Sequence, residues 1–216
     1  MLLLVDSADR DEIRRATATG LVTGVTMNPA LVAARAPTAP LDVLAAALDV
    51  SGAGPVFYQP TSPDRAEAAL EVDAAVALAP DRVVIKLPAV AGSTPVARRL
   101  YGAGVPVALT AVYAPAQALV AAALGCRWVI PYVDRARRLL PDAPPVVPAL
   151  AAVLRGGGPR ILAASVKSGE QAVEAVLQGA HAITAPLAVL EQLIDHPLSD
   201  SAVAEFDAAV RRATDR

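Results

Sequence analysis

The sequence has few of the residues that disulfide-bonded, metal-binding and nucleic-acid-binding proteins use. Its 216 residues include one cysteine, Cys126, which excludes an internal disulfide and metal sites of the CxxC type. The two histidines, His181 and His196, do not have the spacing of metal ligands, so no metal is expected. Seven aromatic residues, a net charge of −2 and the lack of a basic run disfavour nucleic-acid binding.

Long hydrophobic runs are also missing. The opening MLLLVD reaches Asp6 after five residues, which is too short for the apolar region of a signal peptide. Pro, Arg and Asp interrupt the later apolar runs before they reach the length of a membrane span. Hydrophobic residues still make up 55% of the chain, which favours one folded domain over disorder. We therefore expect a cytoplasmic protein without a membrane segment.

What the chain does have is a regular alternation of two kinds of segment. Short apolar runs predict strands at residues 2–6, 24–26, 55–59, 82–88, 106–112, 128–133, 160–166 and 182–186. Between them, apolar residues recur every three or four positions, which predicts helices. Eight such pairs predict an α/β fold, a (β/α)8 TIM barrel, because the alternative open sheet usually has fewer strands. We expect a single domain over residues 1–216, with the barrel in 1–197 and an extra C-terminal helix in 198–216.

The fourth predicted strand, RVVIKLP, has a lysine among apolar residues. Burying an ammonium group is costly unless it is paired or neutral, and a neutral lysine amine is a nucleophile. The simpler alternative is that Lys86 extends its charge to the surface. However, barrel active sites lie at the C-terminal ends of the strands. Polar residues that lie there, on or just after other strands, are Asp6, Thr26, Asn28, Gln59, Thr110, Tyr132, Ser165 and Lys167. Their convergence favours an active site around Lys86.

Eight segments also have the order and spacing of a known family. They are LLLVDSAD, GVTMNPAL, VFYQ, VVIKLP, LTAVYAPAQALVAAALG, PYVDR, ILAASVKS and APLAVLEQLIDHPLSD. On these segments the chain resembles the small transaldolase family, and within it the fructose-6-phosphate aldolase branch. The resemblance implies a TIM barrel, an imine-forming lysine on the fourth strand, a sugar or sugar-phosphate substrate, and no metal or organic cofactor. It also implies a ring-like homo-oligomer, a pentamer or decamer, in which the C-terminal helix reaches a neighbour.

The resemblance also assigns roles to individual residues. Lys86 would form the Schiff base of a class I aldolase. The other expected catalytic residues are Asp6, which holds a substrate hydroxyl, and Gln59, Thr110 and Tyr132, which hold a water and move protons. The expected substrate-binding residues are Thr26, Asn28 and Ile130 at the sugar and Arg135, Ser165 and Lys167 at its phosphate.

The resemblance leaves three functions to compare. Gln59 and Tyr132 are typical of the aldolase branch, where transaldolases have Glu and Phe, so a lyase is favoured. The first alternative is a transaldolase that moves a dihydroxyacetone unit between sugar phosphates. The second is a non-catalytic barrel that binds sugar phosphate.

Several residues depart from the family pattern, and they leave the natural donor, the acceptor and the need for phosphate open. Met27 and Ala30 replace hydroxyl residues, and Ile130 replaces a small residue. Strand alternation places Ile130 on the face of Tyr132, beside the expected imine. The segment ARRLLPDAPPVVPAL is expected to be an altered loop after Arg135. Trp128 is expected to pack the sixth strand against the helices.

Overall fold

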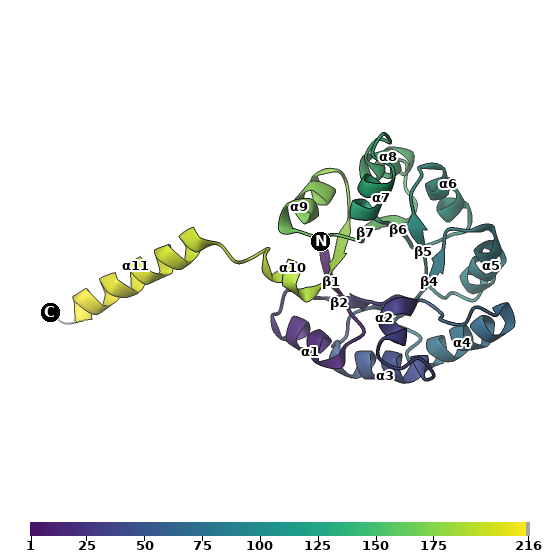
Figure 1. The fold of residues 1–216 in the computed structure, drawn as a ribbon, viewed down its shortest axis with the longest axis horizontal. Helices are drawn as coiled ribbons and strands as arrows, with labels where there is room; N and C mark the ends of the chain where they lie inside the picture. Colours follow the sequence, from purple (N-terminus) through teal and green to yellow (C-terminus); the bar gives the residue numbers. More distant parts are fainter. Residues whose placement is uncertain (215–216) are drawn as a thin grey trace.

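The computed structural model describes residues 1–214 and contains a closed barrel of eight parallel strands, paired in chain order (Figure 1). The strands are β1 (Leu2–Asp6), β2 (Gly24–Thr26), β3 (Val56–Tyr58), β4 (Val83–Pro88), β5 (Val107–Val112), β6 (Trp128–Pro131), β7 (Arg160–Ala163) and β8 (Ala182–Ala185). Helices surround this ring of strands. The predicted (β/α)8 TIM barrel is confirmed.

The helices follow the strands in the expected alternation. They are α1 (Arg10–Ala18), α2 (Pro29–Ala33), α3 (Pro40–Val50), α4 (Arg65–Leu78), α5 (Thr94–Gly102), α6 (Ala116–Ala123), α7 (Val133–Leu139), α8 (Val146–Val153), α9 (Gly169–Leu177), α10 (Leu187–Glu191) and α11 (Pro197–Thr214). The expectation of a loop over ARRLLPDAPPVVPAL was wrong, because α7 and α8 occupy both of its ends. Only residues 140–145, with prolines at 141, 144 and 145, connect these two helices.

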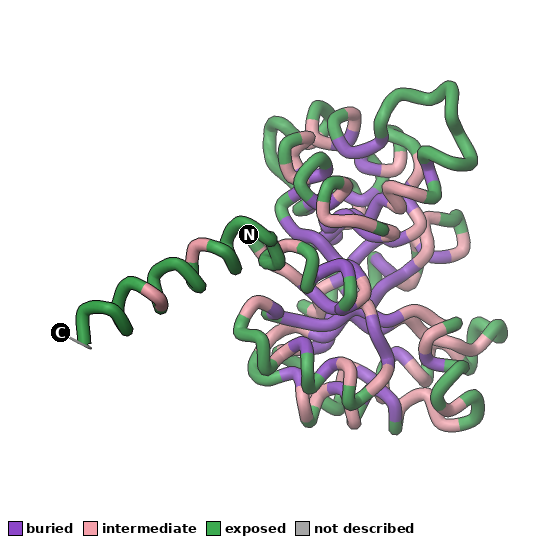
Figure 2. Tube along the Cα trace, turned by 60° about the vertical axis from the view of Figure 1, so that its left-hand side comes forward, coloured by how far each residue is buried: buried purple, intermediate pink, exposed green. Residues whose placement is uncertain are grey.

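Side chains of the strands form two separate apolar layers. One layer packs between strands and helices, and the other consists of residues in or directly after the strands and contains no helix residue, so it fills the barrel. The buried members of the interior layer are Leu4, Phe57, Val84, Ala108, Trp128, Ile130, Leu162, Ala164 and Ala182. In Figure 2 the buried parts of the chain accordingly concentrate in the central strands.

Trp128 lies inside the barrel, so the expectation that it packs β6 against the helices was wrong. Its ring meets that of Phe57 edge to face, with 5.8 Å between the centroids. The guanidinium of Arg160 lies over the same indole, 4.6 Å from its centroid. The physical reason is strand alternation, because Trp128, Ile130 and Tyr132 have the same parity and therefore face the same side.

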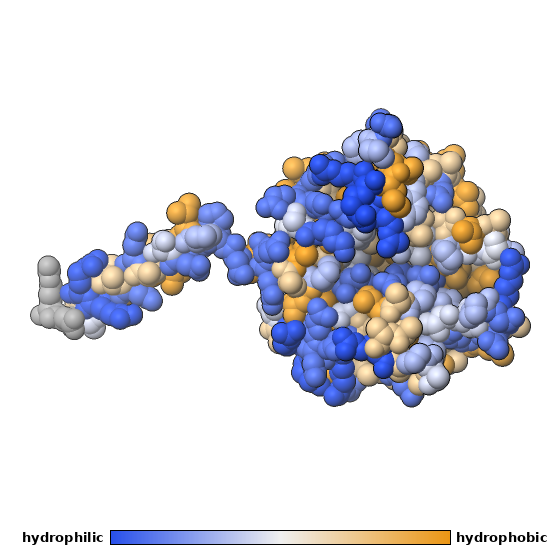
Figure 3. All heavy atoms as spheres, in the orientation of Figure 1, coloured by the Kyte–Doolittle hydropathy of each residue, from blue (hydrophilic) through white to orange (hydrophobic). Residues whose placement is uncertain are grey.

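The helix α11 projects away from the barrel (Figures 1 and 2). None of its described residues is buried, and Phe206 is 67% exposed. Hydrophobic side chains stand among hydrophilic ones along this helix (Figure 3). Over residues 1–214, no helix is both long enough and apolar enough to cross a membrane.

Candidate active site

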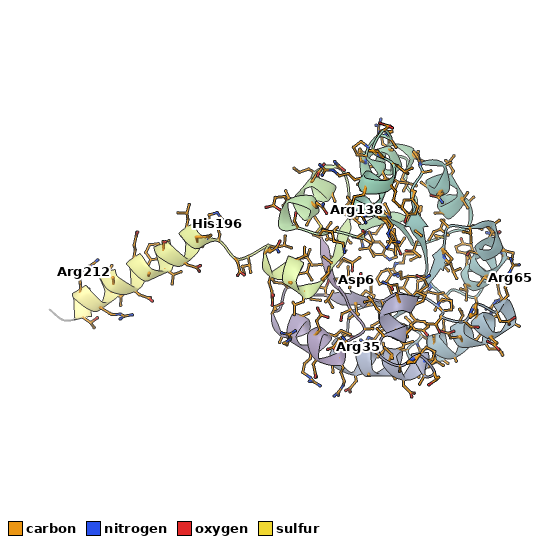
Figure 4. The ribbon with its side chains drawn as sticks, in the orientation of Figure 1. Asp6, Arg35, Arg65, Arg138, His196 and Arg212 are labelled. Carbon is orange, nitrogen blue, oxygen red and sulfur yellow. The ribbon has the colours of Figure 1, made fainter. Side chains whose placement is uncertain are left out.

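A chain of three hydroxyl and carboxyl groups lies at the C-terminal ends of β1, β2 and β8. Asp6 and Thr26 are register partners, and the Thr26 hydroxyl donates to Asp6 Oδ1 over 2.7 Å. The Thr184 hydroxyl lies 2.6 Å from that of Thr26 and must donate to it, because the Thr26 proton is already used. Asp6 lies within the ring of strands (Figure 4). Thr184 was not predicted as a site residue, although it also stands near the end of a strand.

Lys86 extends into the barrel rather than to the surface. The residue is only 4% exposed, and Nζ donates to the backbone carbonyl of Met27 over 2.9 Å. Burial lowers the pKa of Lys86, and the nearby charge of Asp6 opposes this shift in part. The neutral, nucleophilic form of the amine is therefore more populated than in a solvated lysine.

Met27 contributes its backbone and not its side chain to this site. Its side chain is fully buried in the layer between strands and helices. The methionine that replaces a hydroxyl residue therefore does not face the barrel interior. Asn28 caps α2, because its Oδ1 accepts hydrogen bonds from the backbone N–H groups of Ala30 and Leu31, both over 3.1 Å. The amide nitrogen of Asn28 takes no part in this cap.

Gln59, Thr110 and Tyr132 lie at the ends of β3, β5 and β6. The buried Oε1 of Gln59 has no hydrogen-bond partner among residues 1–214. The hydroxyls of Thr110 and Tyr132 are 3.5 Å apart, which is the outer limit of a direct hydrogen bond. Just after Thr110, the strand register shifts and Ala111 adopts a φ of 56°, as in a β-bulge. The three side chains thus offer donors and acceptors that the protein itself leaves weakly paired.

Two neighbouring side chains pack against the ring of Tyr132. The ring of Tyr113 meets it edge to face with 5.9 Å between centroids, and the guanidinium of Arg135 lies 5.1 Å from its centroid. Ile130, which precedes Tyr132 on the same face, is 1% exposed and belongs to the interior layer. The structure thus agrees with the expected register of β6.

The residues predicted to bind phosphate lie on two neighbouring segments at the rim. Arg135 is in α7, whereas Ser165 and Lys167 are in the segment between β7 and α9. Ser165 has a φ of 58°, a left-handed conformation that is uncommon for a residue other than glycine. The carboxylate of Asp134, next to Arg135, accepts hydrogen bonds from Arg138 Nε over 2.9 Å and from Gln171 Nε2 over 3.4 Å. The Arg138 bond is the main cause of the lowered pKa of Asp134.

Three side chains on helices hold segments that follow strands, and sequence reasoning missed them all. Glu71 accepts hydrogen bonds from two backbone N–H groups between β3 and α4. Gln117 does the same after β5 and also donates to the carbonyl of Ala89. Gln171 accepts a bond from the backbone N–H of Lys167 after β7. Gln117 and Gln171 each accept the backbone N–H of residue i−4, and Gln117 also accepts that of residue i−3. This spacing is a weak signal that becomes useful only once the strand ends are known.

The acidic and basic groups of the site do not resemble a metal centre. Within residues 1–214, no group of three or more His, Cys, Asp or Glu side chains is arranged to hold a metal ion.

A surface cavity of about 360 Å³, lined by Leu140, Gln171 and Glu174 among others, lies among α7, α8 and α9, outside the ring of strands.

A TIM barrel with a buried lysine among polar strand ends is the arrangement of an aldolase-type enzyme, and comparison with known proteins agrees. The profile of the Transaldolase/Fructose-6-phosphate aldolase family matches residues 3–216. The chain is 35% identical over 208 residues to a protein named "Probable transaldolase" from Anaeromyxobacter sp. (strain Fw109-5), covering 95% of both chains. It is also 35% identical to a protein of the same name from Chlorobium phaeovibrioides, over 97% of this chain and 99% of the relative. A third such protein, from Sorangium cellulosum, is 33% identical and matches 98% of both chains.

The chain therefore belongs to the transaldolase/fructose-6-phosphate aldolase family. It is an enzyme of the transaldolase or aldolase kind, and the resemblance seen in the sequence is confirmed.

Proposed function

We propose that the protein is a class I aldolase of the fructose-6-phosphate aldolase type. It cleaves or forms a C–C bond of a ketose or ketose phosphate through a Schiff base on Lys86. The observation that carries this proposal is the environment of Lys86. A buried lysine with a lowered pKa, next to one carboxylate, is suited to form an imine.

In the proposed cleavage, the neutral amine of Lys86 attacks the C2 ketone, and the resulting carbinolamine takes up one proton and loses water to give an iminium ion. The iminium takes up the electron pair of the C3–C4 bond as that bond breaks, while the C4 hydroxyl loses its proton and departs as an aldehyde. The resulting enamine is protonated at C3, which gives an iminium ion again, and water hydrolyses this ion to the ketone, the free amine and a proton. The charge of Asp6, which already opposes the lowered pKa of Lys86, would stabilise the cationic iminium as well.

Gln59, Thr110 and Tyr132 are proposed to hold the water that carries these protons. The support is geometric, because the buried Oε1 of Gln59 has no hydrogen-bond partner in the described residues 1–214, and the hydroxyls of Thr110 and Tyr132 are too far apart for a strong direct bond. A water between them would satisfy all three groups. Asp6 and the amide nitrogen of Asn28, which takes no part in the cap of α2, are proposed to hold substrate hydroxyls.

Arg135, Ser165 and Lys167 are proposed to bind a phosphate of the substrate. Phosphate groups in TIM barrels commonly bind at the loops after strands seven and eight, and Ser165 and Lys167 follow β7. The guanidinium of Arg135 lies over the ring of Tyr132. A phosphate bound to Arg135 would therefore lie close to the proposed proton-transfer group.

A transaldolase is the second candidate, and the names of the curated relatives favour it. The two activities differ in the fate of the enamine, which is protonated and released in a lyase and waits for a second aldehyde in a transferase. Tyr132 provides a phenol that can protonate the enamine, and for this reason we favour the lyase.

Borohydride trapping tests the central step. Incubation with a ketose and borohydride should attach the donor to Lys86 and abolish activity, and Lys86→Met should prevent both. Lys86→Arg should be equally inactive, because a guanidinium stays protonated. An active adduct on Lys167, or no adduct with any ketose or ketone, would refute the proposal and, in the second case, favour a non-catalytic barrel. Analysis of products with and without an added acceptor aldehyde separates lyase from transferase.

We also propose that the protein forms a symmetric homo-oligomer, a pentamer or decamer, through α11. Val203, Phe206 and Val210 are spaced by three and four residues, so they form one apolar stripe. All three are more than half exposed, and the helix projects from the barrel instead of folding back on it. A second copy of the chain is the occupant that the family resemblance suggests for this stripe.

A further inference from the structure

We infer that Gln171 is a positioning residue for the phosphate site. The site has two halves, Arg135 on α7 and the pair Ser165 and Lys167 after β7, and Gln171 holds these halves in a fixed position relative to each other. The inference rests on the proposed function, because it takes Arg135, Ser165 and Lys167 as the phosphate ligands. Gln171 itself would not touch the phosphate. It would act through the segments that carry these ligands.

The two halves of the site touch directly through their backbones. The N–H of Val133, at the start of α7, donates to the carbonyl of Ala164 over 2.9 Å. The next N–H, of Asp134, donates to the carbonyl of Ser165 over 3.2 Å. These two bonds fix the beginning of α7 against the end of β7. They do not reach Lys167, which lies two residues beyond the second bond.

The side chain of Gln171 completes this connection. Its Oε1 accepts the backbone N–H of Lys167 over 2.9 Å, and its Nε2 donates to Asp134 Oδ1 over 3.4 Å. Its own backbone N–H donates to the Ser168 hydroxyl over 3.3 Å and is thereby fixed at the first turn of α9. One amide therefore connects α7, the segment after β7, and α9. Both ends of the amide are used, the oxygen as an acceptor and the nitrogen as a donor.

The hydrogen bonds of the Gln171 side chain also orient the negatively charged carboxylate of Asp134. Asp134 lies next to Arg135 in the chain, and the charge of Lys167 is near enough to help lower the pKa of Asp134. A carboxylate in this place could pair with either cation and so compete with a phosphate. The bonds from Arg138 and Gln171 direct Asp134 away from that role. Without Gln171, Lys167 would lose its backbone anchor and Asp134 would lose one of its two partners.

The test compares two aldehydes with one ketone donor in the direction of C–C bond formation. Glyceraldehyde 3-phosphate carries the phosphate, and glyceraldehyde does not. Gln171→Met keeps the length of the side chain and removes both hydrogen bonds. We expect KM for the phosphorylated aldehyde to rise about five- to tenfold, as for the loss of about one hydrogen bond. KM for glyceraldehyde and both kcat values should stay within about twofold, and inhibition by inorganic phosphate should weaken.

Two further variants sharpen the comparison. Gln171→Glu keeps the acceptor for Lys167 but places a second carboxylate against Asp134. It should therefore also raise the KM ratio, which is KM for glyceraldehyde 3-phosphate divided by KM for glyceraldehyde. This variant replaces Gln171→Met in the test if Gln171→Met does not fold. Gln117→Met removes the equivalent side chain after β5 and should leave the KM ratio unchanged. A rise in both KM values together, or a fall in kcat alone, would show a merely structural role for Gln171 and overturn the inference.

Arg135→Ala and Lys167→Ala separate this inference from the proposed function. If neither changes the preference for the phosphorylated aldehyde, the proposed phosphate site is wrong. If they abolish the preference and Gln171→Met and Gln171→Glu do not affect it, the site is right and the positioning role alone is wrong.

Discussion

The contact between Tyr58 and Glu71 should dominate the stability of the segment between β3 and α4. Tyr58 is fully buried on the face of β3 opposite Phe57, and its hydroxyl donates to Glu71. The same carboxylate accepts the backbone N–H groups of Thr61, over 2.8 Å, and of Ser62, over 3.1 Å. Burial is the main cause of the raised pKa of Tyr58, and Glu71 adds to it. Glu71→Ala would leave a buried phenol and two backbone donors without this acceptor.

The expected magnitudes follow from which groups can reach water. A buried donor without a partner costs about 1–3 kcal/mol. The phenol is fully buried, whereas the loop N–H groups are near the surface, so Glu71→Ala should cost about 3 kcal/mol. Tyr58→Phe leaves the carboxylate with its backbone donors and should cost about 1 kcal/mol. The double variant contains no buried phenol without a partner and should cost about 2 kcal/mol. This is about 2 kcal/mol less than the sum of the two single costs, and the difference is the coupling free energy.

Urea denaturation of the four proteins, at one protein concentration, measures this coupling. Costs that simply add would refute the reasoning.

The pH dependence of stability gives a second check. Because the pKa of Tyr58 is raised in the folded state, its contribution to stability is complete below about pH 10 and is lost as the pH rises above that value. Above pH 10 the wild type should therefore lose stability faster than Tyr58→Phe, and parallel curves would contradict the burial argument.

Three further predictions concern other parts of the chain. Ile130→Ala should improve the use of dihydroxyacetone relative to hydroxyacetone, because it frees space for the C1 hydroxyl beside the expected imine, while costing about 2–4 kcal/mol of stability. Steady-state rates with both donors and urea denaturation check this, and an unchanged ratio would mean that Ile130 does not contact the donor. A chain ending at Pro197 should be smaller than the intact oligomer by light scattering, whereas a monomeric intact protein would refute the assembly and an unchanged oligomer would place the interface elsewhere. Asp9→Ala removes the N-cap of α1 and should cost about 1 kcal/mol at pH 7. The hydrogen bond from the Glu12 backbone is the main cause of the lowered pKa of Asp9, so this cost should be present above about pH 4 and shrink below it. An unchanged cost at pH 3 would refute that explanation.

Much of the fold could be predicted because strand and helix patterns are local. All eight strands lie within the predicted ranges, and the errors are at their ends. The sixth strand ends at Pro131, and Tyr132 makes only an isolated bridge to Ala164. A strand ends where its neighbour stops pairing, and this is not visible in the apolar run itself. The helices within ARRLLPDAPPVVPAL were missed because each covers only a short part of this segment, too short to show a helical apolar period, and the prolines at 141, 144 and 145 are typical of a loop.

The positions of the candidate site residues at or near the strand ends could be predicted, but their hydrogen-bond partners could not. Strand alternation correctly placed Ile130 on the same face as Tyr132, and the same rule, if applied to Trp128, would have placed it there too. By contrast, nothing local indicates that Thr184 bonds to Thr26 across 158 positions in the chain.

By itself, the sequence determined that eight strand–helix units form this chain, that polar groups stand at the strand ends, and that a lysine lies in an apolar strand. These features depend on the period of side chains along the backbone, which neighbouring residues set. Only the tertiary structure decided that the amine of Lys86 bonds to the carbonyl of Met27, 59 positions away, and that Gln171 joins Lys167 to Asp134. It also decided that α11 leaves the barrel with its apolar stripe exposed. Such contacts form when the closed barrel brings distant strand ends together, and buried polar groups then take the partners that this closure provides.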